Sequence, residues 1–585
     1  MSASRSQIDV LKNGIELGGV SLSLLYFMPA TSFNPELVKK YNENRLSVME
    51  EVYIDDENKQ RVDLVIFLNG LPIISFELKD ENSGQDYSDA IKQYCADRDS
   101  KNPLFLFKSG TIVNYAMDLN ECWMTTKLDG TSTRFIPFNK GKGEGIQSGA
   151  GNPDDDGSGD FPVHYMWDDI LTKDSIIEIV TKFCFVQKKT KKNEATGKSK
   201  PDTSIVFPRY HQRDAVRKII EDVKINHSSL NYLIEHSAGS GKSNTIAWLA
   251  YRLSSLHDAD DKQIFDTVLI VTDRVVVDDQ LQKVIKSIDH KQGYIKVISD
   301  KDTKVKGTSA DLKDALKGNT KIICTTIQKF IYVAQDIFDI QGEMANKTFA
   351  VIIDEAHSST AGKDMTALHM SLGGVEEDSD TEDYDTEDYT AEDRIEQQFA
   401  EAVKRNGKQA NVSIFAFTAT PKPTTIQLFG REDKKGQKQA FHLYSMKQAI
   451  EEGFILDVLQ NYIEYKTYYE LCKQTEDDPL LKTNAAKRQI ARFVDLTDDN
   501  INQRVNIIIE HFRTSVMEQL GGQAKAMVIT ASRDAAVKYQ KAFNAYIQRM
   551  GYSDIHSLVA FSGKVILEDD PTKTEYTEKK MNGIP

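Results

Sequence analysis

Three charged residues near the amino terminus lie in or beside two apolar stretches. Asp63 lies at the start of the first stretch, and Glu77 and Lys79 lie at the end of the second. A charge on a buried strand costs on the order of several kcal/mol unless it is paired. The dipeptide Asn69-Gly70 joins the two stretches and favours a tight hairpin turn. The sequence therefore predicts two paired strands that carry a cluster of charges.

These three charges are of the kind that phosphodiester hydrolysis requires. Side chains alternate along a strand, so Glu77 and Lys79 point to one face, and the hairpin can bring Asp63 beside them. We predict that Asp63 and Glu77 hold Mg²⁺, which activates water, while Lys79 orients that water or offsets developing charge. The spacing alone is weak because these residue types are common. In the structural alternative, Lys79 pairs with Glu77 or Asp80 at a solvated strand end.

A second group of residues has the pattern of a phosphate-binding loop. The segment His236 to Ser243 fits G-x-x-x-x-G-K-[ST], except that His236 replaces the first glycine. Glycines let backbone N–H groups approach phosphate oxygens, and the start of the following helix adds positive potential. The lysine would reach the β and γ phosphates of ATP, and the serine hydroxyl would bind Mg²⁺. The predicted ATP-binding residues here are Gly239, Ser240, Gly241, Lys242 and Ser243, the last also a metal ligand.

Two later strand ends supply further groups for phosphoryl transfer. An Ile- and Val-rich stretch ends in Asp354 and Glu355. The first acid can hold Mg²⁺, and the second can polarise the attacking water. Upstream of the loop, Gln212 could read the edge of adenine through its amide, although a glutamine at a helix start is more often only solvated. The remaining predicted nucleotide-site residues are His357, Thr418 and Thr420.

The elements that would position this second group alternate between buried-looking strands and helices from residue 205 to about 440. Such alternation is typical of a parallel α/β sheet, so the predicted fold class is α/β. A further strand is predicted at Lys525 to Thr530, where it would begin a second, unfinished α/β unit. The Gly-rich segment Gly141 to Asp160 is predicted to be a surface loop, and Lys188 to Ser204 a linker. The buried strands are predicted at YLIEH, TVLIVT, KIICTT, FAVIID and SIFAFT.

The composition is that of a globular protein with roughly three or four domains for its 585 residues. The chain has no apolar run long enough for a membrane span and no signal peptide, so it is expected to be cytoplasmic and to bind no membrane. Five scattered cysteines are expected to be reduced thiols. The net charge of −15 neither supports nor excludes nucleic-acid binding, because residues 376–393 carry eleven acids and no base, which leaves −4 elsewhere.

The nucleotide-site residues together resemble the superfamily 2 helicases and translocases. Gln212 is similar to the adenine-reading glutamine of that family, and Gly239 to Ser243 to its motif I. The family's last two motifs, including its arginine fingers, have no match before Pro585. The resemblance thus implies a truncated chain that binds ATP but hydrolyses it and translocates poorly. The other segments similar to family motifs are Thr272–Gln280, Thr325–Phe330, Asp354–His357, Thr418–Thr420 and Val528–Ala536.

The amino-terminal charges resemble the PD-(D/E)xK nuclease core. Its union with such a motor resembles the restriction (R) subunits, or HsdR proteins, of type I restriction-modification enzymes. That resemblance implies an endonuclease domain over residues 1–187, a linker over 188–204 and a RecA-like, ATP-binding motor domain over 205–445. A second, partial motor domain would cover 446–585.

Two departures from the nuclease family matter. Many members carry Q-x-x-x-Y on the helix after the lysine, but here the position four before Tyr94 is Ala90, and Gln93 is adjacent instead. Both Tyr94 and Gln93 are therefore kept as candidates. In addition, no residue among the first sixteen can be assigned to the upstream acidic ligand that is usual in the family.

The resemblance implies double-stranded DNA as substrate, ATP and Mg²⁺ as cofactors, and methyltransferase (M) and specificity (S) subunits as partners. The R subunit would pull DNA at the cost of ATP and cut unmodified DNA away from the recognition site. One rival is a helicase or translocase whose nuclease-like domain only binds DNA. Another is a non-enzymatic, ATP-sensing module that uses residues 376–393 as a binding arm, although the composition of that segment favours a solvated loop.

Overall fold

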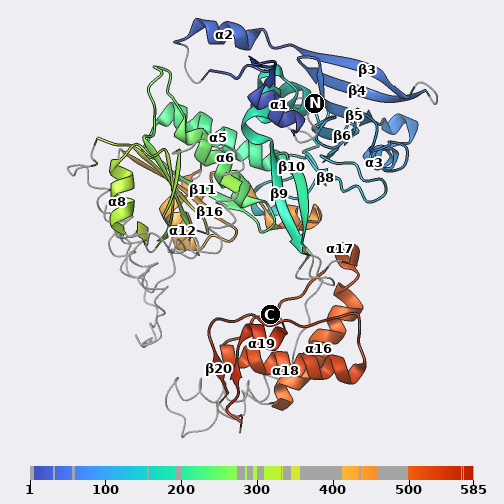
Figure 1. Cartoon of the computed structure of the whole chain (residues 1–585), viewed down its shortest axis with the longest axis vertical. Helices are drawn as coiled ribbons and strands as arrows, with labels where there is room; N and C mark the ends of the chain where they lie inside the picture. The colour runs from blue at the N-terminus through green and yellow to red at the C-terminus, as the bar shows by residue number, and fades with distance from the viewer. Residues whose placement is uncertain are drawn as a thin grey trace. The chain divides into compact units, whose positions relative to one another are not determined.

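The computed structural model divides the chain into two compact units, Met1–Ile455 and Leu456–Pro585 (Figure 1). It describes residues 5–272, 284–285, 294–298, 309–355, 411–457 and 498–583, apart from short internal gaps. His357, the acidic segment 376–393 and all but the first residue of Thr272–Gln280 lie outside the described residues. The predicted boundary between residues 445 and 446 falls inside the first unit, and the division into functional domains stays a prediction.

The amino-terminal part of the first unit is built on a six-stranded sheet of order β3-β4-β5-β6-β7-β8. The predicted hairpin is present: Asn69 and Gly70 have φ of 50° and 82°, the left-handed values that a tight turn of this kind requires. Helix α3, Tyr87–Ala96, links β5 to the parallel strand β6. The strands are β3 (Leu46–Asp55), β4 (Gln60–Leu68), β5 (Leu71–Leu78), β6 (Val113–Met117), β7 (Cys122–Thr125) and β8 (Ile136–Pro137).

Both faces of the central strands of this sheet are covered, whereas most of the edge strand β3 is exposed. One face packs against α3 in a cluster that includes Val65, Ala90 and Tyr94. The other face packs against α1 (Gln7–Asn13) and the segment around α4 (Lys173–Glu178) in a larger cluster. The middle of the sheet is therefore buried, and a charge on either face there needs a partner.

The segment predicted to be a linker is different in the structure. β9 (Phe185–Lys192) and β10 (Ser199–Val206) pair antiparallel over their whole length, from Phe185 opposite Val206 to Lys192 opposite Ser199. The charged composition concealed the hairpin, since only its Phe185, Val186, Ile205 and Val206 end is apolar and packs into the protein core.

The second part of the first unit is a seven-stranded sheet of order β13-β14-β12-β15-β16-β11-β19, and every neighbouring pair is parallel. The predicted α/β class is thereby confirmed, and all five predicted strands are present. Their bounds are β11 (Asn231–His236), β12 (Thr267–Thr272), β14 (Ile322–Thr326), β15 (Phe349–Ile353) and β16 (Val412–Thr418). The outer strands are β13 (Ile295–Ile298) and β19 (His442–Tyr444).

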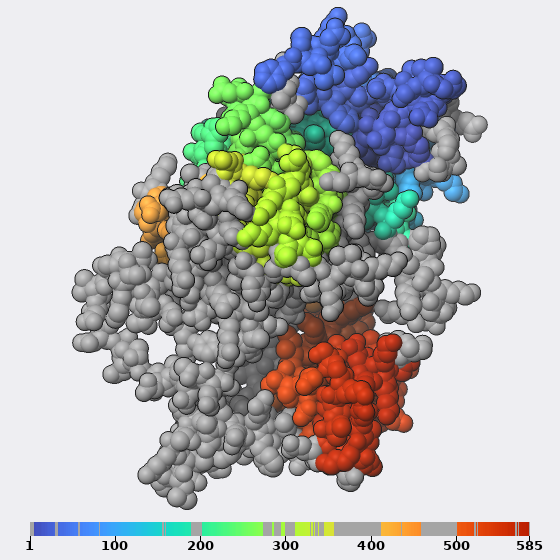
Figure 2. All heavy atoms as spheres, turned by 60° about the vertical axis from the view of Figure 1, so that its left-hand side comes forward, coloured from blue at the N-terminus to red at the C-terminus, as the bar shows by residue number. Residues whose placement is uncertain are grey.

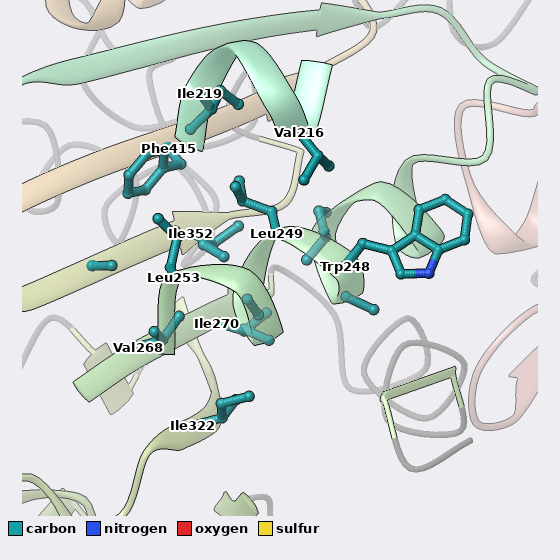
Figure 3. Close-up of a cluster of buried hydrophobic side chains, with 14 of the residues drawn as sticks. Val216, Ile219, Trp248, Leu249, Leu253, Val268, Ile270, Ile322, Ile352 and Phe415 are labelled. Carbon is teal, nitrogen blue, oxygen red and sulfur yellow. The ribbon is translucent and has the colours of Figure 1, made fainter. Parts of the chain in front are cut away.

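Helices cover both faces of this parallel sheet (Figure 1). Helices α5 (Tyr210–Asn226) and α6 (Lys242–Ser254) pack on one face through the cluster drawn in Figure 3, in which Leu249 and Leu253 lie against the strands. Trp248 points away from the strands and packs against Phe183 and Phe185. Helices α8 (Ser309–Lys317) and α12 (Pro423–Phe429) pack on the other face. Near-continuous Val, Ile and Leu runs are what a strand buried on both faces requires.

The two sheets of the first unit are joined by specific polar contacts. The Trp248 indole N–H donates to the carbonyl of Phe183 at 2.9 Å. The predicted surface loop, Gly141 to Asp160, reaches helix α13 (Met446–Glu451), where the Ala150 N–H donates to the Glu451 carboxylate at 2.7 Å. Part of the predicted surface loop therefore contacts another element of the first unit.

The second unit contains helices and one short hairpin in the residues that the structure describes. Helices α16 (Asp498–His511) and α18 (Arg533–Met550) pack through Ile501, Val505 and Tyr546, and Figure 2 shows the described residues of this unit gathered in one body. The strand predicted at Lys525 to Thr530 is absent there, and Met527 and Ile529 are 83% and 84% exposed. A strand needs a neighbour to bond its backbone, and the described strands of this unit, β20 (Val565–Ile566) and β21 (Glu575–Tyr576), pair with each other.

No helix among the described residues has both the length and the apolar character needed to cross a bilayer. The described cysteines, Cys95, Cys122, Cys184 and Cys324, are thiols and form no disulfide among the described residues.

Candidate nuclease and nucleotide sites

The hairpin that carries Asp63 and Glu77 contains a β-bulge, and this bulge decides which face each acid occupies. Next to the turn, Leu68 pairs with Leu71, but beyond the irregularity Ile66 pairs with Ile74 and Leu64 with Phe76. Ile73 is the extra residue. Continuing the register places Asp63 opposite Glu77, on the same face. If the same residues continued the register of the turn without a bulge, Asp63 would face Phe76, and Glu77 would point to the other side of the sheet.

Helix α3 and the residues after it hold the side chains on this face of β5. Tyr94 hydrogen-bonds Ser75 at 2.8 Å between hydroxyl oxygens. Lys79 donates from Nζ to Oε1 of Gln93 at 2.6 Å, rather than forming the carboxylate pair of the structural alternative. Gln93 and Tyr94 therefore both contact the face, by separate bonds. The third contact comes from a residue that the sequence did not indicate.

Glu77 is paired with Arg98. The Arg98 Nε donates to Oε1 of Glu77 at 2.7 Å, and the two side chains are 4% and 0% exposed. The same guanidinium donates to the main-chain carbonyl of Arg61 at 2.7 Å. A buried carboxylate without such a partner would be strongly destabilising. This pair explains how an acid can lie in the middle of a buried strand.

The electrostatic environment of the two acids differs. Burial raises the pKa of Glu77 from its ordinary 4.5 to about 7, against the lowering effects of the bond from Arg98 and the charge of Lys79. Asp63 accepts a hydrogen bond from the Leu78 N–H at 2.7 Å. Oε2 of Glu77 is buried and has no hydrogen-bond partner, so it is an acceptor that a cation could satisfy.

The donors on this face fit a divalent cation only in part. Asp63 and Glu77 supply carboxylate oxygens from opposite strands, and hard cations such as Mg²⁺ prefer oxygen ligands. The described residues contain no group of three or more His, Cys, Asp or Glu side chains arranged to hold a metal. Water and a substrate phosphate would have to complete the coordination, as Mg²⁺ usually requires.

The predicted phosphate loop follows β11 and leads into α6. Gly239 and Gly241 have φ of 74° and 80°, in the region that glycine adopts without strain. A Cβ on Gly241 would lie 2.5 Å from the amide nitrogen of Gln212, and one on Gly239 would lie 3.2 Å from Ile455 and Phe454. Ser240 is buried, and its hydroxyl has no partner. The loop thus has the backbone shape and the close approaches that a phosphate cradle needs.

Residues at the start of α5 hold this loop. Gln212, 2% exposed, donates from its amide to the carbonyls of Ser240 and Gly241, each at 3.1 Å. Its amide oxygen accepts from the Arg209 N–H at 2.9 Å. Arg209 in turn donates to the Gly239 carbonyl at 2.8 Å. The structure therefore places Gln212 against the loop backbone, where its amide positions the loop.

The two acids after β15 lie at the same end of the sheet as the loop. Lys242 Nζ and Glu355 Oε1 are 3.4 Å apart, and the Asp354 N–H donates to the Val271 carbonyl at 2.9 Å. Glu355 has a φ of 56°, an uncommon value that turns the chain sharply after the strand. Ser243 lies in the first turn of α6. These donors fit Mg²⁺-ATP, with Lys242 and Ser243 toward phosphate and Asp354 toward the metal.

The Thr418-Ala419-Thr420 segment follows the adjacent strand β16. Thr418 is fully buried, and its hydroxyl accepts from the Thr420 N–H at 3.3 Å. The bond fixes the turn out of the strand. Thr418 thus shapes the backbone at the end of β16, next to the strand that carries the P-loop.

The departure from the loop pattern at His236 also has a structural reason. His236 ends β11 in extended backbone, so the position does not need glycine. Its ring hydrogen-bonds His442 at 2.9 Å, and His442 bonds Asp214 at 3.0 Å. Burial lowers the pKa of His236. For Asp214, burial favours a higher pKa, but the bond and charge of His442 together with Lys218 bring it down to about 2.

The sequence did not reveal Arg98, Arg209 or the pair Asp214–His442. Each acts on a residue at least twenty-one positions away in the chain, so its role is defined only by the fold. The one available signal was the apparent lack of a partner for the buried Glu77, which required a cation somewhere in the sequence.

Two family models match parts of the chain. A family model for the type I restriction enzyme R protein N terminus matches residues 36–143, which include Asp63, Glu77, Lys79 and Arg98. A family model for the SWI2/SNF2 ATPase matches residues 211–490, which include the P-loop and the acids after β15.

Individual relatives agree with these matches. The type I restriction enzyme SsaAORF53P endonuclease subunit of Staphylococcus saprophyticus is 24% identical over 520 residues, covering 86% of this chain and 44% of that protein. The HindI endonuclease subunit of Haemophilus influenzae is 22% identical over 520 residues, covering 85% and 42%. The chain spans less than half the length of these curated relatives. A solved fragment assigned as an HsdR subunit from Vibrio vulnificus aligns over 86% of this chain and 71% of its own, at 14% identity and a TM-score of 0.31.

Proposed function

The chain is an HsdR-like relative of the R subunits of type I restriction enzymes, and from this premise we propose that it couples an ATP-driven DNA motor to a DNA endonuclease. The observation that carries the proposal is that two constellations occur in one compact unit. One is the P-loop with Lys242 next to Glu355, and the other is the face shared by Asp63, Glu77 and Lys79.

In the motor, the P-loop backbone and Lys242 would bind the phosphates of ATP. Ser243 and Asp354 would hold Mg²⁺, which neutralises charge on the phosphates when bound. Glu355 would orient the attacking water and accept its proton. Its ion pair with Lys242 at 3.4 Å would then have to open, because the ammonium would turn toward phosphate. The segments after the strands would contact the DNA backbone, which gives salt-sensitive and sequence-tolerant binding.

In the nuclease, Asp63 and Glu77 would hold a divalent cation between the two strands of the hairpin. A bound Mg²⁺ would supply an activated water and stabilise the leaving oxygen. Lys79, held by Gln93, would orient that water or offset charge on the scissile phosphate. The arrangement contains no element that reads base sequence among these residues. Cutting would thus depend on the motor to deliver DNA.

The substrate would be double-stranded DNA, and site recognition would come from M and S subunits in the cytoplasm. The R protein would pull unmodified DNA and cut it away from the recognition site. This assignment is supported by the likeness to the R protein and SWI2/SNF2 family models.

The test compares wild type with Asp63→Ala, Lys79→Ala and Lys242→Ala, in complex with M and S subunits on an unmethylated plasmid with Mg²⁺ and ATP. Cutting and ATP turnover are measured separately. We expect Asp63→Ala and Lys79→Ala to lose cutting and keep turnover, because the sites are separate. Lys242→Ala should lose both, because cutting depends on the motor.

A second candidate is favoured by one specific observation. Arg98 already pairs with Glu77, and the described residues provide no third acid at the face. This would suit a superfamily 2 helicase or translocase whose nuclease-like domain only binds DNA. If wild type turns over ATP in the complex yet never cuts, this second function replaces the first.

A further inference from the structure

Arg98 reaches both strands that carry the predicted metal ligands. It lies two residues beyond the end of α3 and is 6% exposed. Its Nε donates to Oε1 of Glu77 on β5, and its terminal nitrogen donates to the carbonyl of Arg61 on β4, each at 2.7 Å. Arg61 is two residues before Asp63. One guanidinium therefore connects the backbone next to one acid with the carboxylate of the other.

Resting on the proposed nuclease function, we propose that Arg98 is a positioning residue of the nuclease site, which holds Oε1 of Glu77 so that Oε2 is left to bind the divalent cation. The two oxygens of Glu77 have different surroundings. Oε1 is bonded to Arg98, whereas Oε2 is buried without a partner. A cation would stabilise Oε2 more than Oε1, because Oε2 has no hydrogen bond that offsets its burial.

The shape of the guanidinium matters in addition to its charge. It is planar and presents donors in a fixed fork, so the bond to the Arg61 carbonyl fixes the direction of the bond to Glu77. A lysine ammonium in the same place could offset the charge of the carboxylate. It could not hold both acceptors in the same plane, and Glu77 would regain rotational freedom.

Residues that orient metal ligands in this way have measurable effects on metal affinity. Changing such a partner typically weakens binding about 10- to 100-fold. By contrast, Arg61 carries an exposed side chain that pairs with Glu51, at 48% and 57% exposure. Because only the main chain of Arg61 meets Arg98, Arg61→Gln is a matched control on the same strand.

The experiment measures Mn²⁺ binding to the whole chain by electron paramagnetic resonance, without nucleotide so that the motor site holds no metal–ATP complex. The variants are Asp63→Ala, Arg98→Met, Arg98→Lys and Arg61→Gln, with folding checked by circular dichroism. Asp63→Ala identifies the ion bound at the nuclease face. We expect Mn²⁺ affinity to fall about 10- to 100-fold in Arg98→Met, and less but clearly in Arg98→Lys, with Arg61→Gln unchanged.

A positioning role also predicts a split between affinity and maximal rate. In the complex with M and S subunits, cutting by Arg98→Lys should recover most of the wild-type rate when Mn²⁺ is raised, which a merely structural defect would not do. Arg98→Lys also keeps the test decisive if Arg98→Met fails to fold.

Folded Arg98→Lys that binds Mn²⁺ within twofold of wild type would overturn the proposal for Arg98 and leave the nuclease function standing. If Asp63→Ala also leaves Mn²⁺ binding unchanged, the nuclease site itself is overturned, and the proposal for Arg98 with it.

Discussion

At the nucleotide site the groups that would meet phosphate come from one unbroken segment, Gly239 to Ser243, and they are mostly backbone N–H groups. At the nuclease face the groups come from two strands of a hairpin and from a helix further on, and they are all side chains. The first site is held by Gln212 and Arg209, which bond the carbonyls of the loop. The second is held by Arg98, which bonds a side chain that is itself a predicted ligand.

The difference shows what each site can tolerate. The phosphate loop depends on the lack of a side chain at Gly239 and Gly241, so a substitution that adds a side chain there should disrupt it. Because its groups are consecutive in the chain, the loop does not depend on strand register. A side-chain face depends on strand register, so it should be sensitive to the number of residues between its members.

The largest expected effect is that of inserting one alanine between Ser75 and Phe76 in β5. The pairs from the turn to Val65 and Ser75 would stay, so the insertion would move Glu77 to the opposite face from Asp63. We expect DNA cutting to fall below detection while ATP turnover is retained, as measured on the same preparation. Deleting Ile73 instead removes the bulge but keeps the pairs on both sides of it, so this control should keep Asp63 opposite Glu77 and retain cutting. Retained cutting by the insertion variant would show that the register does not position the acids.

The second prediction concerns pH. Burial raises the pKa of Glu77 from 4.5 to about 7, so the folded nuclease domain binds a proton that the unfolded chain releases between these values. The resulting stability is complete below about pH 4.5 and is lost as pH rises through about 7, by at most about 3 kcal/mol. Hydrogen exchange of β5 and α3, corrected for intrinsic rates, should show falling protection from pH 5 to 8. Glu77→Gln should remove this dependence.

The strand before the P-loop should show no such pH dependence in the same experiment. The bond and charge of His442 bring the pKa of Asp214 down to about 2 despite burial. Its contribution is therefore present above about pH 4 and is lost only as pH falls toward 2. Protection of β11 should not change through Asp214 between pH 5 and 8. A parallel fall in both regions would contradict the assignment to Glu77.

The third prediction is that Gly241→Ala weakens ATP binding about 10-fold or more. Alanine at position 241 would have to keep the positive φ of the glycine, which costs about 1–2 kcal/mol of conformational strain. Its methyl group would also lie 2.5 Å from the Gln212 amide nitrogen. Gly130 has a similar φ of 57° with open space around its missing Cβ, so Gly130→Ala controls for backbone strain. Titration with a fluorescent ATP analogue gives both affinities. Equal, wild-type affinity in the two variants would argue against a tight cradle.

The smallest expected effect distinguishes two roles of Gln212. Because its amide bonds the loop backbone, Gln212→Ala should weaken ATP and GTP binding alike, by about threefold to tenfold. If Gln212 instead reads adenine, the variant should lose affinity for ATP only. Competition binding with both nucleotides separates the outcomes.

A matched control for this substitution is Gln263→Ala. The Gln263 amide also donates to two main-chain carbonyls, those of Ser254 at 3.1 Å and Phe265 at 2.8 Å. Ser254 is the last residue of α6, at the opposite end of the helix from the phosphate loop. Gln263→Ala should therefore lose a similar pair of bonds and leave the affinity for both nucleotides unchanged.

Much of the parallel sheet could be predicted from the sequence because each buried strand is a local apolar run, and the P-loop is a local motif. The hairpin turn was equally local, in Asn69-Gly70. The bulge at Ile73 could not be predicted, since it depends on how the strands pack and leaves no pattern in the residues. Arg98 was missed for a related reason, because a buried ion pair between residues 77 and 98 is defined only by the fold.

The strand predicted at Lys525 to Thr530 failed for the opposite reason. Its residues have strong strand propensity, but propensity describes a fit to a pleated neighbour, and the described part of the second unit offers none there. The hairpin β9–β10 formed despite its charged composition, because each strand supplied the other with backbone partners over its full length.

The bulge also changes how this site can be found in other sequences. In a two-residue hairpin without a bulge, residues that face each other are separated by an odd number of positions, as Leu68 and Leu71 are. One extra residue makes the separation even, as for Leu64 and Phe76, and it places Asp63 and Glu77 fourteen positions apart. In a distant relative that lacks the extra residue, the two facing acids would be thirteen positions apart. A search with one fixed spacing would therefore overlook proteins with the same pair of facing acids.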